Sequence, residues 1–372
     1  MKRTIVLSTI SLHKMAGGLE RNFVRVANHF SAQGHDVRLL TFDMPEAESF
    51  FPLHAGITWH KTGRTRPHGK ISFAERLRLF QRMRIALKTH NPRPVIIIAF
   101  HHGILLRLFI AGAFLRKKLV CSERNSLTIY NHIRLSQWNL NFLMLALCKA
   151  ITVQFEAYRH DYPSWLRKKI ICIPNLVEPA LSQAQTIKPD AQGRYRILAV
   201  GRLCAQKNYD YLIETFGALT ETFPKWDLYI IGNGDLEPHL RHKIQHMNLE
   251  SRIFLPGVAA PEAMHAWYAS SHLYCMPSQW EGFPNALAEA LAHGLPSVGF
   301  EGCAGVRDLI ADGKNGLLAP GHGDVQSLHA ALSRFMTDEH LRAEMSGNAV
   351  ESVKPYTAGR IFSLWDQLTE RL

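Results

Sequence analysis

The stretch Ser278–Pro296, SQWEGFPNALAEALAHGLP, carries two glutamates on either side of a Gly-Phe-Pro-Asn turn. The apolar run HLYCMP before it predicts a short strand, and the run ALAEALAHG predicts a helix ended by glycine. Because proline favours the first turn of a helix, we expect helix from about Pro284 to His293. Glu281 then lies in the loop ahead of this helix, and Glu289 lies more than one turn inside it.

Free backbone amides at the start of this helix make the turn a candidate anion site. The first N–H groups of a helix have no partner inside it, and the helix dipole is positive there, which favours a phosphate. The flanking carboxylates could accept hydrogen bonds from sugar hydroxyls, so the turn suits a phosphate between two sugars. Each glutamate alone could equally be an ordinary surface residue. The candidate residues are Glu281, Gly282, Phe283, Pro284, Asn285, Ala286 and Glu289.

Strand-like and helix-like segments alternate along the rest of the chain, which predicts an α/β fold with parallel sheets. The strands expected in the first half are TIVLST, DVRLLTF, PVIIIAF, KKLVCSE and AITVQF, and those in the second are YRILAVG, WDLYIIGNG, RIFLPG, HLYCMPS and LPSVGF. The polar stretch ALSQAQTIKPDAQGR between them predicts a linker. We therefore expect two doubly wound, Rossmann-like domains, over residues 1–180 and 190–355.

Ligands of such sheets bind outside the carboxyl ends of the strands, where the chain has two further groups of interest. Arg202 follows the strand RILAV, and Lys207 comes five residues later, so the two cations could hold two phosphates. Both could equally be surface charges. Near the start, Gly17 and Gly18 form a di-glycine turn that could contact phosphate or an acceptor hydroxyl. This turn is not a complete G-x-G-x-x-G fingerprint, which disfavours a dehydrogenase.

Composition places the chain among globular proteins of a reducing compartment. It has 372 residues, of which 47% are hydrophobic, and its six cysteines form no C-x-x-C pair. The start MKRTIVLST shows no signal-peptide cleavage pattern, and no uncharged apolar window is long enough to span a bilayer. We expect a cytoplasmic protein with buried free thiols.

Charge is distributed unevenly between the two halves. Residues 1–190 contain 28 Lys and Arg against 11 Asp and Glu, whereas the remainder contains 15 against 20. The segment Lys61–Arg93 alone has ten basic residues and one acid. This excess of positive charge predicts an anionic partner for the first half of the chain, which could be phosphate groups, a lipid surface or nucleic acid.

Within this basic segment, Ser72–Lys88 predicts an amphipathic helix. Its apolar residues Phe73, Leu77, Phe80 and Leu87 lie roughly along one face, with arginines around them. One hypothesis is that the helix lies on an anionic membrane and receives a lipid-diphosphate acceptor. The alternative is a helix that packs its apolar face on the core of its domain and exposes its basic face to solvent.

Taken together, these segments resemble the retaining glycosyltransferases of family 4, which have the GT-B architecture. The similar motifs are GGLER, IPNLVEP, VGRLCAQKN, IGNGDL, EGFPNALAEALAHGLP and DGKNGLL, and they cover nearly the whole chain. The resemblance implies two Rossmann-like domains facing across a cleft, an acceptor-binding domain first and a donor-binding domain second. It also implies that the last helix, within residues 356–372, packs back on the first domain.

The resemblance further implies roles for individual residues. Arg202 and Lys207 would hold the donor diphosphate, Glu289 would bind the ribose hydroxyls, and Glu281 would bind the transferred sugar and stabilise the positive charge that develops on it. The amides of residues 283–286 would cradle sugar and phosphate, and Gly18 would approach the diphosphate. The chain contains no Asp-x-Asp, so we expect these cations, and not a metal ion, to neutralise the leaving group.

The chain departs from the family at two places. The family's histidine after the strand that ends VCSERN is absent, and Glu123 and Arg124 stand there instead. Arg124 is a candidate contact to phosphate or acceptor, and His101 or His102 could serve in place of the missing histidine, although a turn histidine is an equal alternative. A glutamate common in the family is replaced by the shorter Asp308.

We therefore expect a metal-independent retaining glycosyltransferase without a cofactor. It would transfer a hexose or N-acetylhexosamine from a nucleotide-diphosphate sugar, with UDP as the expected nucleotide, to a membrane-associated glycan such as a polyprenyl-diphosphate oligosaccharide or lipopolysaccharide core. Its place would be the cytoplasmic face of the inner membrane. One alternative is a GT-B UDP-sugar epimerase, which needs no acceptor. The other is a basic nucleic-acid-binding Rossmann module, but the chain shows no RNP, KH or zinc pattern, and this alternative leaves Glu281 and Glu289 unexplained.

Overall fold

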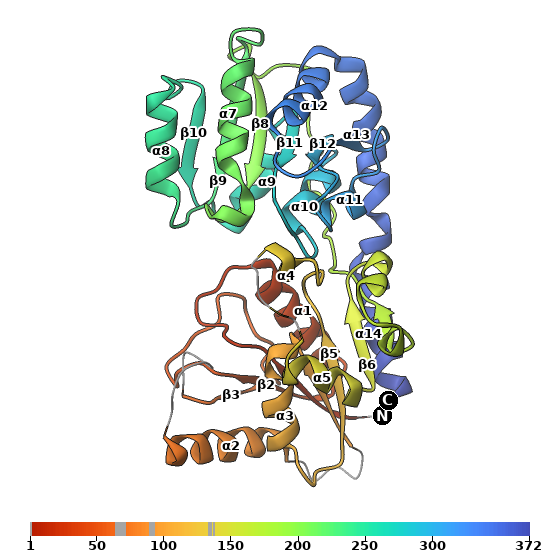
Figure 1. Cartoon of the computed structure of the whole chain (residues 1–372). Coiled ribbons are helices and arrows are strands. Elements are labelled where there is room, and N and C mark those ends of the chain that lie inside the picture. Colours follow the sequence, from red (N-terminus) through yellow and green to blue (C-terminus); the bar gives the residue numbers. More distant parts are fainter. Residues whose placement is uncertain (1, 64–71, 89–93, 133–135, 137) are drawn as a thin grey trace. The chain divides into compact units, whose positions relative to one another are not determined.

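The computed structural model describes residues 2–63, 72–88, 94–132, 136 and 138–372. The chain divides into two compact units. The first contains Met1–Asn175 together with Gly359–Leu372, and the second contains Leu176–Ala358 (Figure 1). The chain thus passes into the second unit at Leu176, ahead of the polar stretch that predicted the linker.

The first unit is built on a seven-stranded parallel sheet in the order β3-β2-β1-β4-β5-β6-β7. Its strands are β1 Thr4–Ser8, β2 Asp36–Thr41, β3 Thr58–Lys61, β4 Val95–Ala99, β5 Lys117–Ser122, β6 Ala150–Val153 and β7 Ile170–Cys172. The inner strands β1 and β4 are buried along their whole length, as expected for a parallel sheet covered on both faces. The strand order reverses between β1 and β4, so the loops that follow these strands open the crevice where such sheets bind ligands.

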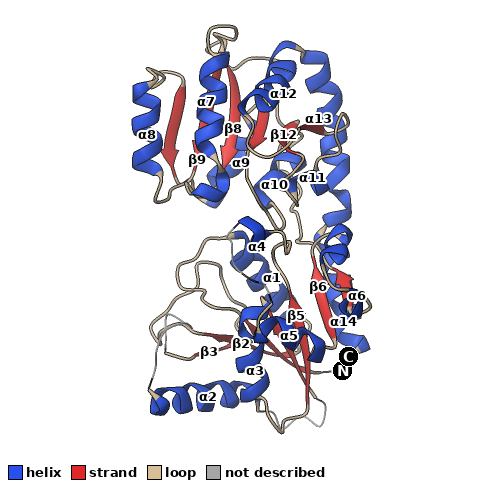
Figure 2. Ribbon diagram, in the orientation of Figure 1, coloured by secondary structure: helices blue, strands red, loops and turns tan. Residues whose placement is uncertain are grey.

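Helices alternate with these strands along the chain (Figure 2). They are α1 Gly18–Ala32, α2 Phe73–Leu87, η1 His102–Ile104, α3 Leu105–Ala111, α4 Ile129–His132, α5 Leu140–Leu143, η2 Met144–Leu147, η3 Glu156–Asp161 and α6 Ser164–Arg167. The last helix, α14 Ala358–Arg371, returns to this unit and buries Trp365 against Phe30 and Phe100. Its Asp366 accepts a hydrogen bond from His29 of α1 at 2.9 Å.

Helix α2 packs through a different face from the one that the sequence predicts. Ser72 caps it in a reciprocal pair with Glu75, as the sequence pattern favours. The buried residues are Leu79, Met83, Ala86 and Leu87. Phe73 and Leu77, which were predicted to share the face of Leu87, are 81% and 51% exposed. They lie in the first half of the helix, where the described part of the unit provides no core to cover them.

The second unit repeats the architecture with a six-stranded parallel sheet in the order β10-β9-β8-β11-β12-β13. Its strands are β8 Tyr195–Val200, β9 Trp226–Ile231, β10 Ile253–Gly257, β11 Leu273–Met276, β12 Ser297–Phe300 and β13 Gly316–Ala319. Its helices are η4 Ala205–Lys207, α7 Tyr209–Leu219, α8 Glu237–His246, α9 Pro261–Ala269, α10 Asn285–Ala292, α11 Val306–Leu309, α12 Val325–Thr337, α13 Glu339–Val353 and η5 Lys354–Tyr356.

The predicted fold class, two doubly wound Rossmann-like α/β domains, is confirmed. In the second unit the strand order reverses between β8 and β11, so the loop that carries Lys207 and the loop that carries Glu281 leave the sheet side by side. None of the described helices has the length and apolar character needed to cross a bilayer.

Candidate functional site

The loops after β8 and β11 meet through an ion pair at the switch point of the second sheet. Lys207 Nζ donates to Glu281 Oε1 at 2.5 Å, and the two side chains are only 15% and 9% exposed. At this depth the attraction between the charges is stronger than at a surface, and each charge depends on the other for compensation. The sequence predicted both residues for the site, but not that they pair with each other.

Two further hydrogen bonds hold the loops together. Gln206 Nε2 donates to the carbonyl oxygen of Trp280 at 2.7 Å, and the backbone N–H of Gln279 donates to the carbonyl oxygen of Gln206 at 2.9 Å. The separation of Lys207 and Glu281 therefore depends on backbone contacts as well as on their own charges. Neither glutamine was predicted for the site from the sequence.

Arg202 differs from Lys207 in its surroundings. It directly follows the glycine at the end of β8, and its side chain is exposed. Its guanidinium makes no hydrogen bond or ion pair with any residue that the structure describes. Since Lys207 is already compensated by Glu281, Arg202 is a positive charge at this strand end that remains available to an anion.

Glycines allow the backbone to pass closely beside this cluster. Gly232, after β9, has a φ of +145°, and a Cβ there would lie 2.0 Å from the carbonyl oxygen of Gly201. A Cβ at Gly201 would lie 2.9 Å from the side chains of Lys207 and Tyr209. Any larger residue at Gly232 would push the loop after β9 away from the loop after β8, which carries both Arg202 and Lys207.

Helix α10 begins one residue later than expected, at Asn285, and ends before Gly294, whose φ is +75°. Its N-cap residue, Pro284, makes no capping hydrogen bond through its side chain. The turn ahead of it, residues 282–284, is buried, whereas Asn285 and Ala286 are partly exposed. The amino end of α10 therefore lies directly beside the Lys207–Glu281 pair, within the same unit.

Glu289, one turn further along α10, is held from the neighbouring helix α9. Tyr268 donates its hydroxyl hydrogen bond to Glu289 Oε2 at 3.0 Å. Tyr268 is buried and stacks on His293, with ring centroids 4.9 Å apart. Burial lowers the pKa of His293, which favours its neutral form. The sequence did not point to Tyr268, because nothing in its spacing shows that α9 reaches this carboxylate.

Asp308, which replaces the family's glutamate, has a local structural contact. Its Oδ2 accepts a hydrogen bond from the backbone N–H of Gly305 at 3.0 Å, in the turn that begins α11. The shorter side chain thus stabilises the start of its own helix.

In the first unit, the di-glycine turn has an acidic neighbour. Gly17 is the N-cap of α1, and a Cβ at this position would lie 2.3 Å from Glu20 Oε2. The Glu20 carboxylate therefore lies at the positive end of the helix, beside this turn. A contact of Gly17 and Gly18 with phosphate or with an acceptor hydroxyl stays a prediction.

His102, and not His101, is the histidine that points into the first unit. It is buried, and both its backbone N–H and its Nδ1 lie 2.9 Å from Glu123 Oε1, while its Nε2 lies 2.7 Å from the hydroxyl of Tyr130. Cys121 Sγ also donates to Glu123 Oε1, at 3.1 Å. Within the buried interior, Glu123 thus accepts three hydrogen bonds, from the backbone and ring of His102 and from Cys121, which the sequence could not show.

These contacts shift the pKa values of both Glu123 and His102. Burial alone would raise the pKa of Glu123, but the charge and hydrogen bond of His102 lower it to about 2. Burial alone would lower the pKa of His102, but the charge and hydrogen bond of Glu123 outweigh it, so the pKa is raised above 6.5. The buried pair therefore favours a charged carboxylate and a charged imidazole.

His101 lies in a strained backbone conformation, and its ring stacks on that of His102, with centroids 4.4 Å apart. Its φ is +136°, a region that residues with a Cβ rarely adopt, and its Nδ1 accepts a hydrogen bond from the N–H of Gly103 at 2.9 Å. Possible metal-ligand atoms of His101, His102 and Glu123 lie within 4.8 Å of one another. Since the atoms on His102 and Glu123 already bond each other, the group is better described as a hydrogen-bond network than as a metal site.

Arg124 is buried and has partners within the first unit. Its guanidinium donates to Asn175 Oδ1 at 2.9 Å and to Ser122 Oγ at 2.6 Å, and it lies over the ring of Phe100, 4.4 Å from the centroid. Burial lowers the pKa of Arg124 to about 9. These contacts are structural, and a contact of Arg124 with substrate stays a prediction.

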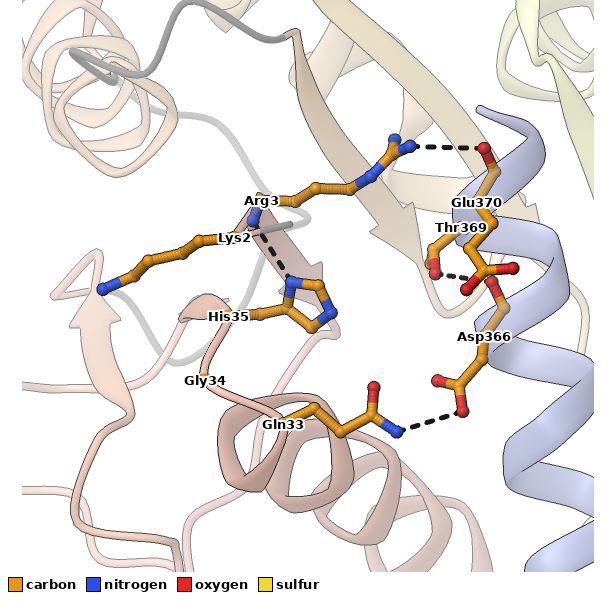
Figure 3. Close-up of a pocket in the computed structure, with 8 residues that line it drawn as sticks. All are labelled: Lys2, Arg3, Gln33, Gly34, His35, Asp366, Thr369 and Glu370. Carbon is orange, nitrogen blue, oxygen red and sulfur yellow. Dashed lines mark hydrogen bonds between the residues drawn. The ribbon is translucent and has the colours of Figure 1, made fainter.

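A polar pocket of about 450 Å³ lies at the other end of the first sheet, beside α14 (Figure 3). Its lining residues are Lys2, Arg3, Gln33, Gly34, His35, Asp366, Thr369 and Glu370. Arg3 bonds the carbonyl oxygen of Glu370 at 3.2 Å, and Gln33 bonds Asp366 at 3.1 Å. Because Arg3 precedes β1, this pocket is at the amino end of the strand and is separate from the candidate site.

Two family models match the chain. The model described as Glycosyltransferase Family 4 matches residues 16–181, and the model described as Glycosyl transferases group 1 matches residues 183–352. The chain belongs to the GT-B glycosyltransferases. The candidate site in the second unit lies wholly within the second match.

Curated relatives match this glycosyltransferase over almost its whole length. An uncharacterized glycosyltransferase of Haemophilus influenzae is 27% identical and covers 94% of this chain and 95% of its own. The amylovoran biosynthesis glycosyltransferase AmsD of Erwinia amylovora is 24% identical, with coverage of 95% and 96%. A Campylobacter jejuni α-1,4-N-acetyl-D-galactosaminyltransferase, named for an undecaprenol-diphosphate glycan, is 25% identical, with coverage of 99% and 98%.

Solved structures support the GT-B fold of this glycosyltransferase. The lipopolysaccharide outer core galactosyltransferase WaaB, in its apo form, has a TM-score of 0.76 at 18% identity and covers both chains completely. The pneumococcal O-GlcNAc transferase GtfA, in complex with UDP and GlcNAc, has a TM-score of 0.79 at 15% identity, covering 100% of this chain and 99% of its own. At these identities the similarity shows the fold alone.

Proposed function

We propose that this glycosyltransferase is a retaining, metal-independent enzyme that transfers a hexose or N-acetylhexosamine from a UDP-sugar to a lipid-linked or polysaccharide glycan. The observation that carries the proposal is the buried Lys207–Glu281 pair, which brings one positive and one negative group to the same switch point. Glycosyl transfer develops negative charge on the leaving diphosphate and positive charge on the sugar, so it needs both signs close together.

The cations and helix α10 would bind the diphosphate. Arg202 is exposed without a partner among the described residues, and the positive end of the α10 helix dipole favours an anion. Lys207 would add a second positive charge as the leaving group becomes more negative. We do not expect a metal clamp, because the sequence has no Asp-x-Asp and because these groups already supply positive charge.

The two glutamates would bind the sugars on either side. Glu281, held in place by Lys207, would accept hydrogen bonds from the transferred sugar and stabilise its positive charge. Glu289, whose carboxylate is positioned by the hydrogen bond from Tyr268, would accept hydrogen bonds from the ribose hydroxyls.

The names of relatives support the choice of donor and acceptor. GtfA was solved with UDP and GlcNAc, AmsD is named for amylovoran, and the Campylobacter enzyme is named for a glycan on undecaprenol diphosphate. A lipid-linked acceptor also agrees with the basic first half of the chain. The exposed cations Arg76 and Arg78 of α2 would contact an anionic membrane, at the inner face of the cytoplasmic membrane.

The test is to incubate the full-length enzyme with a panel of UDP-sugars, with and without an undecaprenol-diphosphate oligosaccharide, and to measure UDP release and product stereochemistry. We expect UDP release that depends on the acceptor and an α-linked product from an α-linked donor. Glu281→Gln should reduce turnover by about 10²-fold or more. Glu250→Gln, an exposed glutamate outside the site, is the matched control. UDP release and sugar epimerisation without any acceptor would instead identify an epimerase.

A further inference from the structure

The first unit presents an apolar surface on α3, α5 and the segments beside them. We call it the α3–α5 surface and define it by seven exposed side chains, Phe109, Ile110, Phe114, Trp138, Leu140, Leu143 and Leu147. The three leucines recur at the helical spacing of one face, whereas Phe142 and Leu145, on the opposite face, are buried. The segment is thus apolar on both faces, and one of these faces is exposed.

Helix α3 contributes the neighbouring part of this surface. It packs beside α5 and η2, and the N–H of Leu106 donates to Asn141 Oδ1 at 3.3 Å (Figure 1). Leu105 and Leu108 face the core, whereas Phe109 and Ile110 are exposed. Two adjacent helices of one unit therefore both expose large apolar side chains, which is more than a scattering of single residues.

Phe114, on the turn after α3, adds a separate observation. Its φ is +62°, a conformation that an aromatic residue adopts only at a cost, and its side chain is fully exposed. Burial of a phenylalanine ordinarily offsets such a cost, but here the ring contacts solvent. The geometry favours a partner that covers this turn.

The charges around the surface indicate the kind of partner. Residues 76–122 and 124–155 contain no aspartate or glutamate, whereas basic residues stand in α3, just before β5 and just before β6, namely Arg107, Arg116 and Lys149. A second copy of the chain would place the same cations against one another, which disfavours a symmetric dimer. An anionic layer with an apolar interior matches both the cations and the apolar side chains.

We propose that the α3–α5 surface inserts into the boundary between headgroups and acyl chains of an anionic bilayer. Trp138 and the leucines would enter this boundary, and the nearby arginines and lysine would contact lipid phosphates. This inference rests on the membrane-associated acceptor of the proposed function and adds an apolar contact, separate from α2, that would orient the first unit on the membrane. It requires no helix that spans the bilayer.

Sedimentation of the full-length protein with vesicles tests this insertion. The vesicles are pure phosphatidylcholine, or equal parts of phosphatidylcholine and phosphatidylglycerol. The test variant is Leu143→Gln/Leu147→Gln, which changes two exposed positions and should leave the core intact. Leu181→Gln, at an 82% exposed leucine of the second unit, is the matched control.

We expect binding to the anionic vesicles, an about tenfold weaker partition for the double variant, and wild-type partition for the control. Some wild-type binding should remain at about 1 M salt, where the Debye length is only about 3 Å. Quenching of wild-type tryptophan fluorescence by brominated lipid should diminish in Trp138→Phe.

Equal binding by the double variant and the wild type would overturn the inference, and so would complete loss of wild-type binding at high salt. A wild-type dimer that the double variant abolishes would also overturn it, by assigning the surface to a second copy. UDP affinity, measured without vesicles, separates the two proposals. Intact UDP binding without vesicle insertion refutes only this inference, whereas insertion without transfer from any UDP-sugar refutes only the proposed function.

Discussion

Removal of Lys207 tests both the stability and the chemistry assigned to the switch point of the second sheet. In Lys207→Ala, Glu281 would remain buried without its 2.5 Å partner. Loss of one member of a fully buried pair costs about 3–5 kcal/mol, and because both side chains here keep slight exposure we expect about 3 kcal/mol. The loops should stay together, since the two glutamine hydrogen bonds do not involve this lysine.

The expected loss corresponds to a fall in melting temperature of about 6–12 °C for a unit of this size. Differential scanning calorimetry on the full-length chain measures it. Lys207→Met/Glu281→Gln should regain most of the stability, because no unpaired charge is left buried. Turnover should fall by about 10²–10³-fold in Lys207→Ala and should not recover in the double variant, because the charge needed at the diphosphate is still missing.

The two measurements thus separate stability from catalysis. If Lys207→Ala has the same melting temperature as the wild type, Glu281 does not depend on Lys207 for compensation of a buried charge. A double variant as unstable as the single variant would assign the loss to packing of the lysine stem and not to the charge of Glu281. Recovery of turnover in the double variant would refute the role of Lys207 at the diphosphate.

Three further substitutions each test a contact within one unit. Tyr268→Phe should weaken UDP binding by about fivefold through looser placement of Glu289, and calorimetry should show a smaller loss for 2′-deoxy-UDP, whereas equal losses would indicate a general structural role. Glu123→Gln should destabilise the first unit by about 3 kcal/mol. The pKa of Glu123 is lowered from 4.5. The stabilisation that its ionised form gives to the first unit is therefore complete above about pH 4.5 and is lost as the pH falls towards 2. The pKa of His102 is raised from 6.5. The stabilisation that its protonated form gives to the first unit is therefore complete below pH 6.5 and is lost as the pH rises through the raised pKa. The difference between the melting temperatures of variant and wild type should therefore be largest between about pH 4.5 and 6.5, and a difference independent of pH would contradict the charged pair. Gly232→Ala should lower the free energy of unfolding by about 2 kcal/mol or more, because the φ of Gly232 is +145° and a Cβ there would lie 2.0 Å from a carbonyl oxygen. An unchanged denaturation midpoint would refute this clash.

Some candidate residues were predictable because strand ends can be recognised locally. The apolar runs mark the strands, and in a parallel α/β sheet the residues after a strand lie at the ligand-binding edge. This reasoning correctly placed Arg202 after β8 and Glu281 between β11 and α10. It also confined the helix around Glu289 to within one residue of its observed bounds.

Other features depended on side-chain direction, which spacing does not contain. The sequence could not decide between His101 and His102, since both follow β4, and only the turn into η1 places His102 against Glu123. It predicted that Arg124 contacts phosphate or acceptor, which stays a prediction, but it could not show that Asn175, Ser122 and Phe100 surround this residue.

The sequence by itself determined two doubly wound domains, the uneven charge and the strand ends at which reactive groups stand, because each of these is a local or additive property of the chain. Only the tertiary structure decided which of these groups meet. Lys207 and Glu281 are 74 residues apart and become partners because the strand order reverses between β8 and β11. Strand order is a consequence of how whole helices and strands pack, so no short stretch of sequence specifies it.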